Sequence, residues 1–199
     1  RDYDTDAVER LCFVRDAQAT GLSLAEIASV LELKAAGSTE GYALVLGVGD
    51  GSLIEALARQ SQLRLICVDP DPARINALRR RLDRAGLYGH RVAAFVADPL
   101  TCGLPPYIAN LIVTEDVKAL KLDRRSKWTS LLNSLRPYGG TLCLAEDPAV
   151  KTLIPTAATS PPLAGVQVRT SNNRLYCRRL GPLPGSAIWS HETGDAARS

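Results

Sequence analysis

The sequence contains no methionine, not even at position 1. It is therefore interpreted as a processed or excised piece, and the missing signal peptide excludes nothing about secretion. No apolar run reaches the roughly 18 residues of a membrane span, so we expect none. The expected location is the cytoplasm, with a removed signal segment left open. Internal repeats and low-complexity tracts are also missing, which favours an ordinary globular protein.

The five cysteines form no C-x-x-C pair and no metal-ligand spacing, so the sequence predicts no metal site. Cys67, Cys143 and Cys177 lie within apolar or strand-like runs, which predicts buried free thiols. The net charge is only +3 over 199 residues. That is too mild to indicate nucleic-acid binding without a local basic patch. This length predicts one domain with a small appendage.

Strand-like and helix-like segments alternate from residue 41 onward. Connections of this length imply right-handed crossovers, so we predict an α/β fold with a mostly parallel sheet and helices on both faces. Residues 164–169 and 173–179 flank the turn "TSN" and predict a closing antiparallel hairpin. The predicted strands are 43–48, 64–68, 92–96, 109–114 and 140–145, and the predicted helices are 52–60, 72–85 and 124–135.

Three regions are expected along the chain. Residues 1–40 form a two-helix segment, in which Ser23 and Glu26 have the spacing of a capping box. The small polar stretch "AAGSTEG" ends this segment. Residues 41–180 form the α/β domain. Residues 181–199 form a tail that could begin a following domain.

Three glycines, Gly47, Gly49 and Gly51, directly follow the first buried strand. Each costs entropy on folding, so the stretch needs either positive φ angles or the close approach of another group. A glycine turn from strand to helix places bare N–H groups and a helix N-terminus beside a ligand. The alternative is that the glycines only allow strand and helix to pack tightly.

Carboxylates end the next three strands of the predicted sheet. Asp69 is suited to accept hydrogen bonds from ribose hydroxyls, and Asp98 to accept from an adenine amino group. Glu115 and Asp116 end the fourth strand. Because parallel strands present their carboxyl ends at one edge, we expect these side chains to share a crevice. Alternatively, Asp69, which precedes Pro70, caps the next helix.

The segments "LVLGVGDGSL", "ICVDPDP", "FVADP", "NLIVTED" and "SLRPYGGTLCL" resemble, in order and spacing, the motifs of class I S-adenosylmethionine-dependent methyltransferases. The resemblance covers about residues 41 to 180. It implies a Rossmann-like, methyltransferase-like domain with S-adenosyl-L-methionine as cofactor and the glycine loop at its methionine end. It also argues against a nicotinamide dinucleotide. One departure is Val45, where family members often carry an acidic residue. The implied cofactor-binding residues are Gly47, Gly49, Asp50, Gly51, Asp69 and Asp98.

Methyl transfer needs a positioned nucleophile and often a nearby base. Asp116 is the favoured candidate and Glu115 the second, while a loop-capping role for both stays open. No N-P-P-Y motif is present, because "LPPY" at 104–107 precedes its strand. The methyl acceptor is therefore not predicted. The alternative that the domain keeps this fold but only binds, without catalysing a reaction, also stays open.

Two further resemblances concern other functions. The glycine loop is similar to that of aminopropyltransferases, in which a carboxylate base would fall at Asp116; the short chain and the lack of an N-terminal β domain count against this. Residues 1–33 resemble the tail of the winged DNA-binding domain of MerR-type regulators, which implies phosphate contacts by Arg1 and Tyr3. The recognition helix of that family is missing, so packing on the sheet or a dimer face stays open.

The segments "GLYGHRV", "IANLIVTED", "LRPYGG" and "WSHETGDA" together resemble large bacterial proteins that join a methyltransferase-like domain to a quinoprotein-like (PQQ-type) propeller. On that resemblance, Trp189 and His191 would begin a propeller. No metal is assigned to His191.

Arginines cluster in two places. The predicted helix over 72–85 carries a run of arginines, which helical spacing distributes over its exposed side. Such a charged side is usually a solvated face. Tyr176 lies between Arg174 and Arg178, and an aromatic residue interleaved with basic ones is a pattern that can bind RNA. Nucleic acid therefore stays open as the methyl acceptor. The arginines of the helix are Arg79, Arg80, Arg81 and Arg84.

Overall fold

The computed structural model describes residues 40–114, 117, 120–122, 125–145, 165–171, 174–183 and 186. Residues 1–39 of the predicted two-helix segment, with their MerR-like residues, and residues 187–199 of the tail, with Trp189 and His191, lie outside these residues. The predictions made for them stay predictions.

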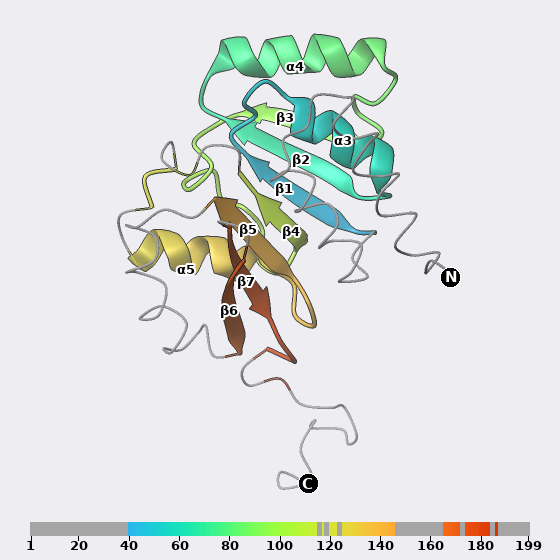
Figure 1. Cartoon of the computed structure of the whole chain (residues 1–199). Helices are drawn as coiled ribbons and strands as arrows, with labels where there is room; N and C mark the ends of the chain where they lie inside the picture. Colours follow the sequence, from blue (N-terminus) through green and yellow to red (C-terminus); the bar gives the residue numbers. More distant parts are fainter. Residues whose placement is uncertain are drawn as a thin grey trace, which may run out of the picture.

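A seven-stranded sheet in the order β3-β2-β1-β4-β5-β7-β6 organises the described residues (Figure 1). The first five of these strands are parallel, β7 runs antiparallel to β5, and β6 and β7 form the closing hairpin. The predicted α/β, Rossmann-like fold is confirmed. The strands are β1 (Tyr42–Leu46), β2 (Arg64–Asp69), β3 (Val92–Val96), β4 (Ala109–Val113), β5 (Thr141–Ala145), β6 (Val166–Ser171) and β7 (Arg174–Arg179).

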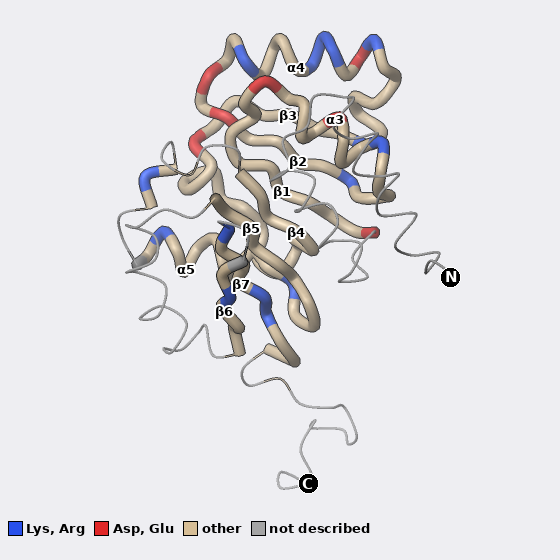
Figure 2. The backbone as a smooth tube through the Cα atoms, viewed as in Figure 1, with Lys and Arg blue, Asp and Glu red and all other residues tan. Residues whose placement is uncertain are grey.

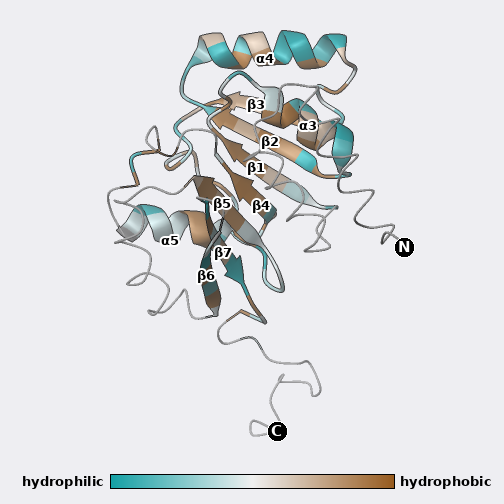
Figure 3. Cartoon of the chain, viewed as in Figure 1, coloured by the Kyte–Doolittle hydropathy of each residue, from teal (hydrophilic) through white to brown (hydrophobic). Residues whose placement is uncertain are grey.

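Helices cover both faces of this sheet. Helices α3 (Ser52–Gln60) and α4 (Pro72–Arg84) lie on one face and α5 (Arg125–Ser134) on the other (Figure 1). Side chains of β1 alternate between the faces: Ala43 and Val45 join the core under α3 and α4, whereas Leu44 and Leu46 join the core under α5. A strand buried on both faces reads as an unbroken apolar run, which explains the hydrophobic colouring of β1, β2 and β4 (Figure 3).

The three cysteines predicted to be buried are buried and form no disulfide with a described residue: Cys67 in β2, Cys143 in β5 and Cys177 in β7. Burial raises the pKa of the Cys177 thiol to about 12, so this group stays uncharged at neutral pH. Among the described residues, no helix is both long and apolar enough to cross a membrane.

Element boundaries differ from the predicted ones by no more than two residues. The first strand ends at Leu46, so Gly47 belongs to the loop. The first strand of the hairpin ends later than predicted. The predicted turn "TSN" begins at residue 170, whereas β6 continues through Ser171. A hydrogen-bond ladder extends while strand residues face each other in register, and Ser171 still pairs with Arg174.

Candidate functional site

The loop between β1 and α3 contains all three glycines of the predicted motif, and each has a left-handed backbone. Their φ values are +80° at Gly47, +48° at Gly49 and +82° at Gly51. Residues other than glycine rarely adopt such angles. The Gly47 N–H donates to the carbonyl oxygen of Val68 at 2.8 Å and thereby ties the loop to β2. The predicted need for positive φ angles is confirmed.

The surroundings of two of these glycines differ: an added Cβ atom would make an ordinary van der Waals contact at Gly47 and a clash at Gly51. A Cβ atom on Gly47 would lie 3.7 Å from the Oγ1 of Thr114, at the end of β4. A Cβ atom on Gly51 would collide with the guanidinium of Arg81 and lie 3.0 Å from Leu78, both on α4. Gly51 therefore lets the start of α3 pack directly on α4, in agreement with the packing alternative for this position.

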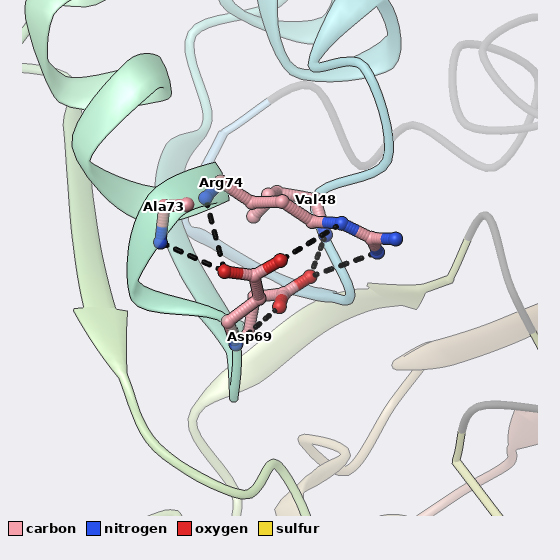
Figure 4. Close-up of polar contacts among 5 residues, drawn as sticks. Val48, Asp69, Ala73 and Arg74 are labelled. Carbon is pink, nitrogen blue, oxygen red and sulfur yellow. Dashed lines mark hydrogen bonds and ion pairs between the residues drawn. The ribbon is translucent and has the colours of Figure 1, made fainter.

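Asp69 ends β2 and is buried, with only 2% of its surface exposed. Its Oδ2 accepts a hydrogen bond from the Val48 N–H at 2.9 Å, and its Oδ1 accepts one from the Asp71 N–H at 2.8 Å. An Arg74 guanidinium nitrogen lies 3.9 Å from Oδ2 (Figure 4). This carboxylate joins the glycine loop to the start of α4. Whether it also contacts a ribose stays a prediction.

Asp71, which the sequence reasoning missed, is the residue that caps α4. Its Oδ1 accepts hydrogen bonds from the N–H groups of Ala73 at 2.8 Å and Arg74 at 3.4 Å (Figure 4). The alternative that Asp69 caps this helix is therefore wrong. The signal was present in the sequence, because Asp71 precedes Pro72, and aspartate before a proline at the first helical position is a common helix start.

Asp98 lies just beyond β3 and is exposed. Its Oδ1 accepts a hydrogen bond from the Leu100 N–H at 2.8 Å, so the side chain stabilises its own turn. In the part of the chain that the structure describes, its Oδ2 has no partner. The Ala97 N–H donates to the Asp69 carbonyl oxygen at 3.2 Å, which keeps the ends of β2 and β3 together. The structure thus brings Asp69 and Asp98 to one edge, as predicted.

Asp50 lies inside the glycine loop and interacts with the start of α3. Its Oδ1 accepts hydrogen bonds from the Ser52 N–H at 2.8 Å and the Ser52 hydroxyl at 2.7 Å. These bonds, with a smaller contribution from the positive charge of Arg81, hold the pKa of Asp50 below its usual value. Asp50 therefore supports the helix start and stays charged at neutral pH.

Glu115 and Asp116, the predicted bases, lie outside the described residues. The strand that leads to them ends at Val113, followed by Thr114, which is 3% exposed. Val117 and Leu120 are buried in the core under α5. The roles assigned to Glu115 and Asp116 stay predictions.

The arginines of α4 do more than solvate its outer face. Both the Nε and Nη2 of Arg79 donate to the carbonyl oxygen of Ala94 in β3, at 3.1 and 2.7 Å. Arg81 forms an ion pair with Glu55 of α3. These contacts correct the expectation of a purely solvated face. Figure 2 shows the basic residues along this helix.

Tyr176 is buried, with 3% of its surface exposed, and the guanidinium of Arg169 lies 5.0 Å from its ring centroid. A ring in this position has no free face on which a base could stack, so the expected aromatic interleaving for RNA is not available at Tyr176. No group of three or more potential metal ligands occurs among the residues that the structure describes.

No protein-family model matches this sequence, and no curated protein matches it. Solved structures do match. A candidate S-adenosyl-L-methionine-dependent methyltransferase from Methanococcus maripaludis has a TM-score of 0.61 and 13% identity, over 91% of this chain and 95% of its own. A SAM-dependent methyltransferase from Aquifex aeolicus has a TM-score of 0.56 and 14% identity, over 74% and 86%. The cyclase SpnF has a TM-score of 0.55 and 14% identity, over 72% and 60%.

Identities of this size show a shared fold and nothing finer. The chain therefore has the Rossmann-like fold of class I S-adenosylmethionine-dependent methyltransferases. The match to a cyclase illustrates that one fold can serve more than one chemistry.

Proposed function

We propose that the chain binds S-adenosyl-L-methionine at the edge formed by the glycine loop and the ends of β2 and β3, and that it transfers the methyl group to an acceptor. The observation that carries this proposal is the loop with three left-handed glycines, placed between β1 and α3 at the same edge as the exposed Asp98 carboxylate. Similarity of fold to S-adenosylmethionine-dependent methyltransferases supports it.

The residues at this edge fit the chemical groups of the cofactor. A side chain on Gly47 would fill the space beside Thr114, so the glycine leaves room between the ends of β1 and β4. The free Oδ2 of Asp98 suits an amino group of adenine. Asp69 is the proposed ribose contact, in addition to its bond to the Val48 N–H in the glycine loop. The proposal thus pairs individual residues of the predicted site with individual groups of the cofactor.

The proposed chemistry needs one base at the end of β4. The cofactor, when bound, supplies an electrophilic methyl group on sulfur. As the acceptor forms its bond to this methyl group and the bond between sulfur and the methyl group breaks, a carboxylate of this chain takes the acceptor's proton. Asp116 is the proposed base and Glu115 the second candidate. The acceptor remains unidentified.

Calorimetric titration with S-adenosyl-L-homocysteine tests the binding step. We expect saturable binding that Asp98→Ala weakens while the free energy of unfolding changes little. Asp83→Ala is the matched control, because Asp83 is an exposed aspartate on α4, away from this edge. Wild-type protein that does not bind S-adenosyl-L-homocysteine would contradict the proposal.

Radiolabelled S-adenosyl-L-methionine mixed with fractionated cell extract tests the transfer step. We expect labelling of one fraction, and loss of that label in Asp116→Asn with cofactor binding retained. Tight binding without transfer to any fraction would instead support a non-catalytic binding domain. One observation favours that second candidate: Val45, fully buried in β1, stands where methyltransferases often carry an acidic residue.

A further inference from the structure

A pocket of about 350 Å³ lies between the glycine loop and α4. One wall is formed by residues 48–51 and the other by a face of α4. The pocket shares part of the glycine loop with the proposed cofactor site, but Gly47, Asp69 and Asp98 do not line it. The pocket therefore overlaps the proposed cofactor site at Gly49, Asp50 and Gly51 and extends from there along α4, where the proposed function uses no residue. Its charged lining residues are Asp50, Arg74, Arg80, Arg81 and Arg84.

Two of the four arginines already have acidic partners. Arg74 lies 3.9 Å from Asp69 and 3.5 Å from Asp71, and Arg81 pairs with Glu55. Arg80 and Arg84, in contrast, are exposed and form no hydrogen bond or ion pair with any residue that the structure describes. The pocket therefore has a positive excess that this part of the chain does not neutralise.

The placement of Arg80 and Arg84 is unfavourable for the helix alone. They are four residues apart on α4, a spacing at which like charges repel and destabilise a helix. The helix dipole favours Arg84 in the last turn, but Arg80 lies before that turn. An external anion between the two guanidinium groups would convert this repulsion into attraction.

The opposite wall also favours an anion. The backbone of Gly49 is exposed, whereas Gly51 is covered by Arg81 and Leu78. The first turn of α3 begins at Ser52, whose N–H donates to Asp50. Helix N-termini carry a partial positive charge, and guanidinium groups form paired hydrogen bonds with phosphate oxygens. The carboxylate of Asp50 is engaged by Ser52 through its Oδ1. Among the lining side chains it is the single negative charge against four positive ones.

We propose that this pocket binds a small ligand that carries two or more adjacent phosphate groups. A volume of about 350 Å³ is at the small end of ligand pockets, which favours a compact polyanion over an extended macromolecule. Adjacent phosphates can contact Arg80 and Arg84 at one end and the glycine-loop amides at the other. The proposal does not depend on methyl transfer.

Inorganic triphosphate, titrated into the full 199-residue chain by calorimetry at low salt, tests this site. We expect saturable binding that is weakened at least tenfold in the double variant Arg80→Gln/Arg84→Gln. The matched control is Arg64→Gln/Arg136→Gln, which removes the same charge from two exposed arginines outside the pocket. We expect the control to keep the wild-type affinity within about twofold. Thermal unfolding of both variants verifies that they are folded.

Three results would overturn the proposal: no binding of triphosphate to the wild type at millimolar concentration, equal losses in the two double variants, or tighter binding of a twelve-nucleotide single strand than of triphosphate. The last would indicate a nucleic-acid surface instead. S-adenosyl-L-homocysteine should keep its affinity for Arg80→Gln/Arg84→Gln. Loss of cofactor binding there would place the arginines in the cofactor site, which is a fourth result that would overturn the proposal.

Discussion

The ends of β2 and β3 carry the same residue type at the same edge of the sheet, yet the two aspartates have opposite surroundings. Asp69 is 2% exposed and accepts hydrogen bonds from two backbone N–H groups, beside Arg74. Asp98 is exposed and accepts one hydrogen bond, from its own turn. One carboxylate holds the fold together, and the other is available to a ligand. A motif that assigns both to cofactor binding does not separate these roles.

The position of each strand in the sheet explains the difference. β2 lies between β1 and β3, so its end is enclosed by the glycine loop on one side and the β3 loop on the other. β3 is the edge strand, and its last residues Phe95 and Val96 are 52% and 44% exposed. An aspartate at an inner strand therefore finds backbone partners, whereas one at the edge strand stays open to solvent.

The largest effect is expected for Asp69→Ala. The substitution leaves the Val48 and Asp71 N–H groups without their acceptor and Arg74 without its buried partner. Hydrogen bonds to a charged group contribute about 1.5–3 kcal/mol each, so we expect a loss of about 3–5 kcal/mol in the free energy of unfolding. Urea denaturation measures it.

Asp69→Asn is the matched variant, since it keeps the shape and one acceptor oxygen. We expect it to lose less than Asp69→Ala. A stability loss below about 1 kcal/mol in Asp69→Ala would contradict the structural role of this carboxylate. It would also make Asp69 resemble Asp98.

The second prediction concerns the other contact that holds the loop, between Gly51 and α4. Gly51→Ala combines an unfavourable φ of +82° with a collision against Arg81 and Leu78. Gly89→Ala is a matched control, because Gly89 has a φ of +81° and a Cβ atom there would meet no other atom within 4 Å. We expect about 1–2 kcal/mol of destabilisation for Gly89→Ala, from backbone strain alone.

For Gly51→Ala we expect up to about 1 kcal/mol more than for the control, because the end of the flexible Arg81 side chain must move and Leu78 must shift slightly. Thermal or urea unfolding of both variants gives the difference. Equal destabilisation would mean that Arg81 moves aside freely. In that case glycine would be required at position 51 only for its left-handed backbone conformation.

The third prediction concerns Asp98, the exposed carboxylate just beyond β3. Asp98→Ala should weaken binding of S-adenosyl-L-homocysteine by about tenfold, which corresponds to one lost charged hydrogen bond of about 1.4 kcal/mol. The expected loss of stability is below about 1 kcal/mol, because only the turn at Leu100 loses an acceptor. Calorimetry and urea denaturation separate the two quantities. A variant that loses stability and keeps its affinity would reverse the comparison between the two aspartates.

Much of this edge could be predicted from the sequence, for identifiable reasons. Gly47, Gly49 and Gly51 follow an apolar run, and only positive φ or close packing accounts for three glycines there. The alternation of strands and helices indicated the sheet, and the residues at the strand ends indicated Asp69 and Asp98. Periodicity carries this information, because it depends on neighbouring residues in the chain.

The direction of the Asp69 carboxylate could not be predicted in the same way. Its partner Val48 lies 21 residues earlier, and only the folded sheet brings that N–H group to the end of β2. The contact of Gly51 with Arg81 is likewise tertiary. Glu115 and Asp116 remain known by their position in the sequence alone. Side chains that act across elements need the fold before their roles can be assigned.

The smallest effect is expected at Asp50, which lies in the glycine loop between β1 and α3. The Ser52 N–H and hydroxyl groups stabilise its charged form and lower its pKa from the usual value of 3.8. A lowered pKa in the folded state means that the contribution is present above pH 3.8 and is lost as the pH falls through the lower, folded-state pKa.

Because Asp50 is exposed to solvent, screening limits its contribution, and we expect Asp50→Asn to cost no more than about 0.5 kcal/mol at pH 7. Urea denaturation of wild type and Asp50→Asn at pH 7, 5 and 3 measures the difference between them. That difference should stay constant from pH 7 to pH 5 and shrink toward pH 3, because protonation removes the negative charge from wild-type Asp50 while asparagine does not titrate. A difference that grows as the pH falls would contradict a stabilising charge at the start of α3.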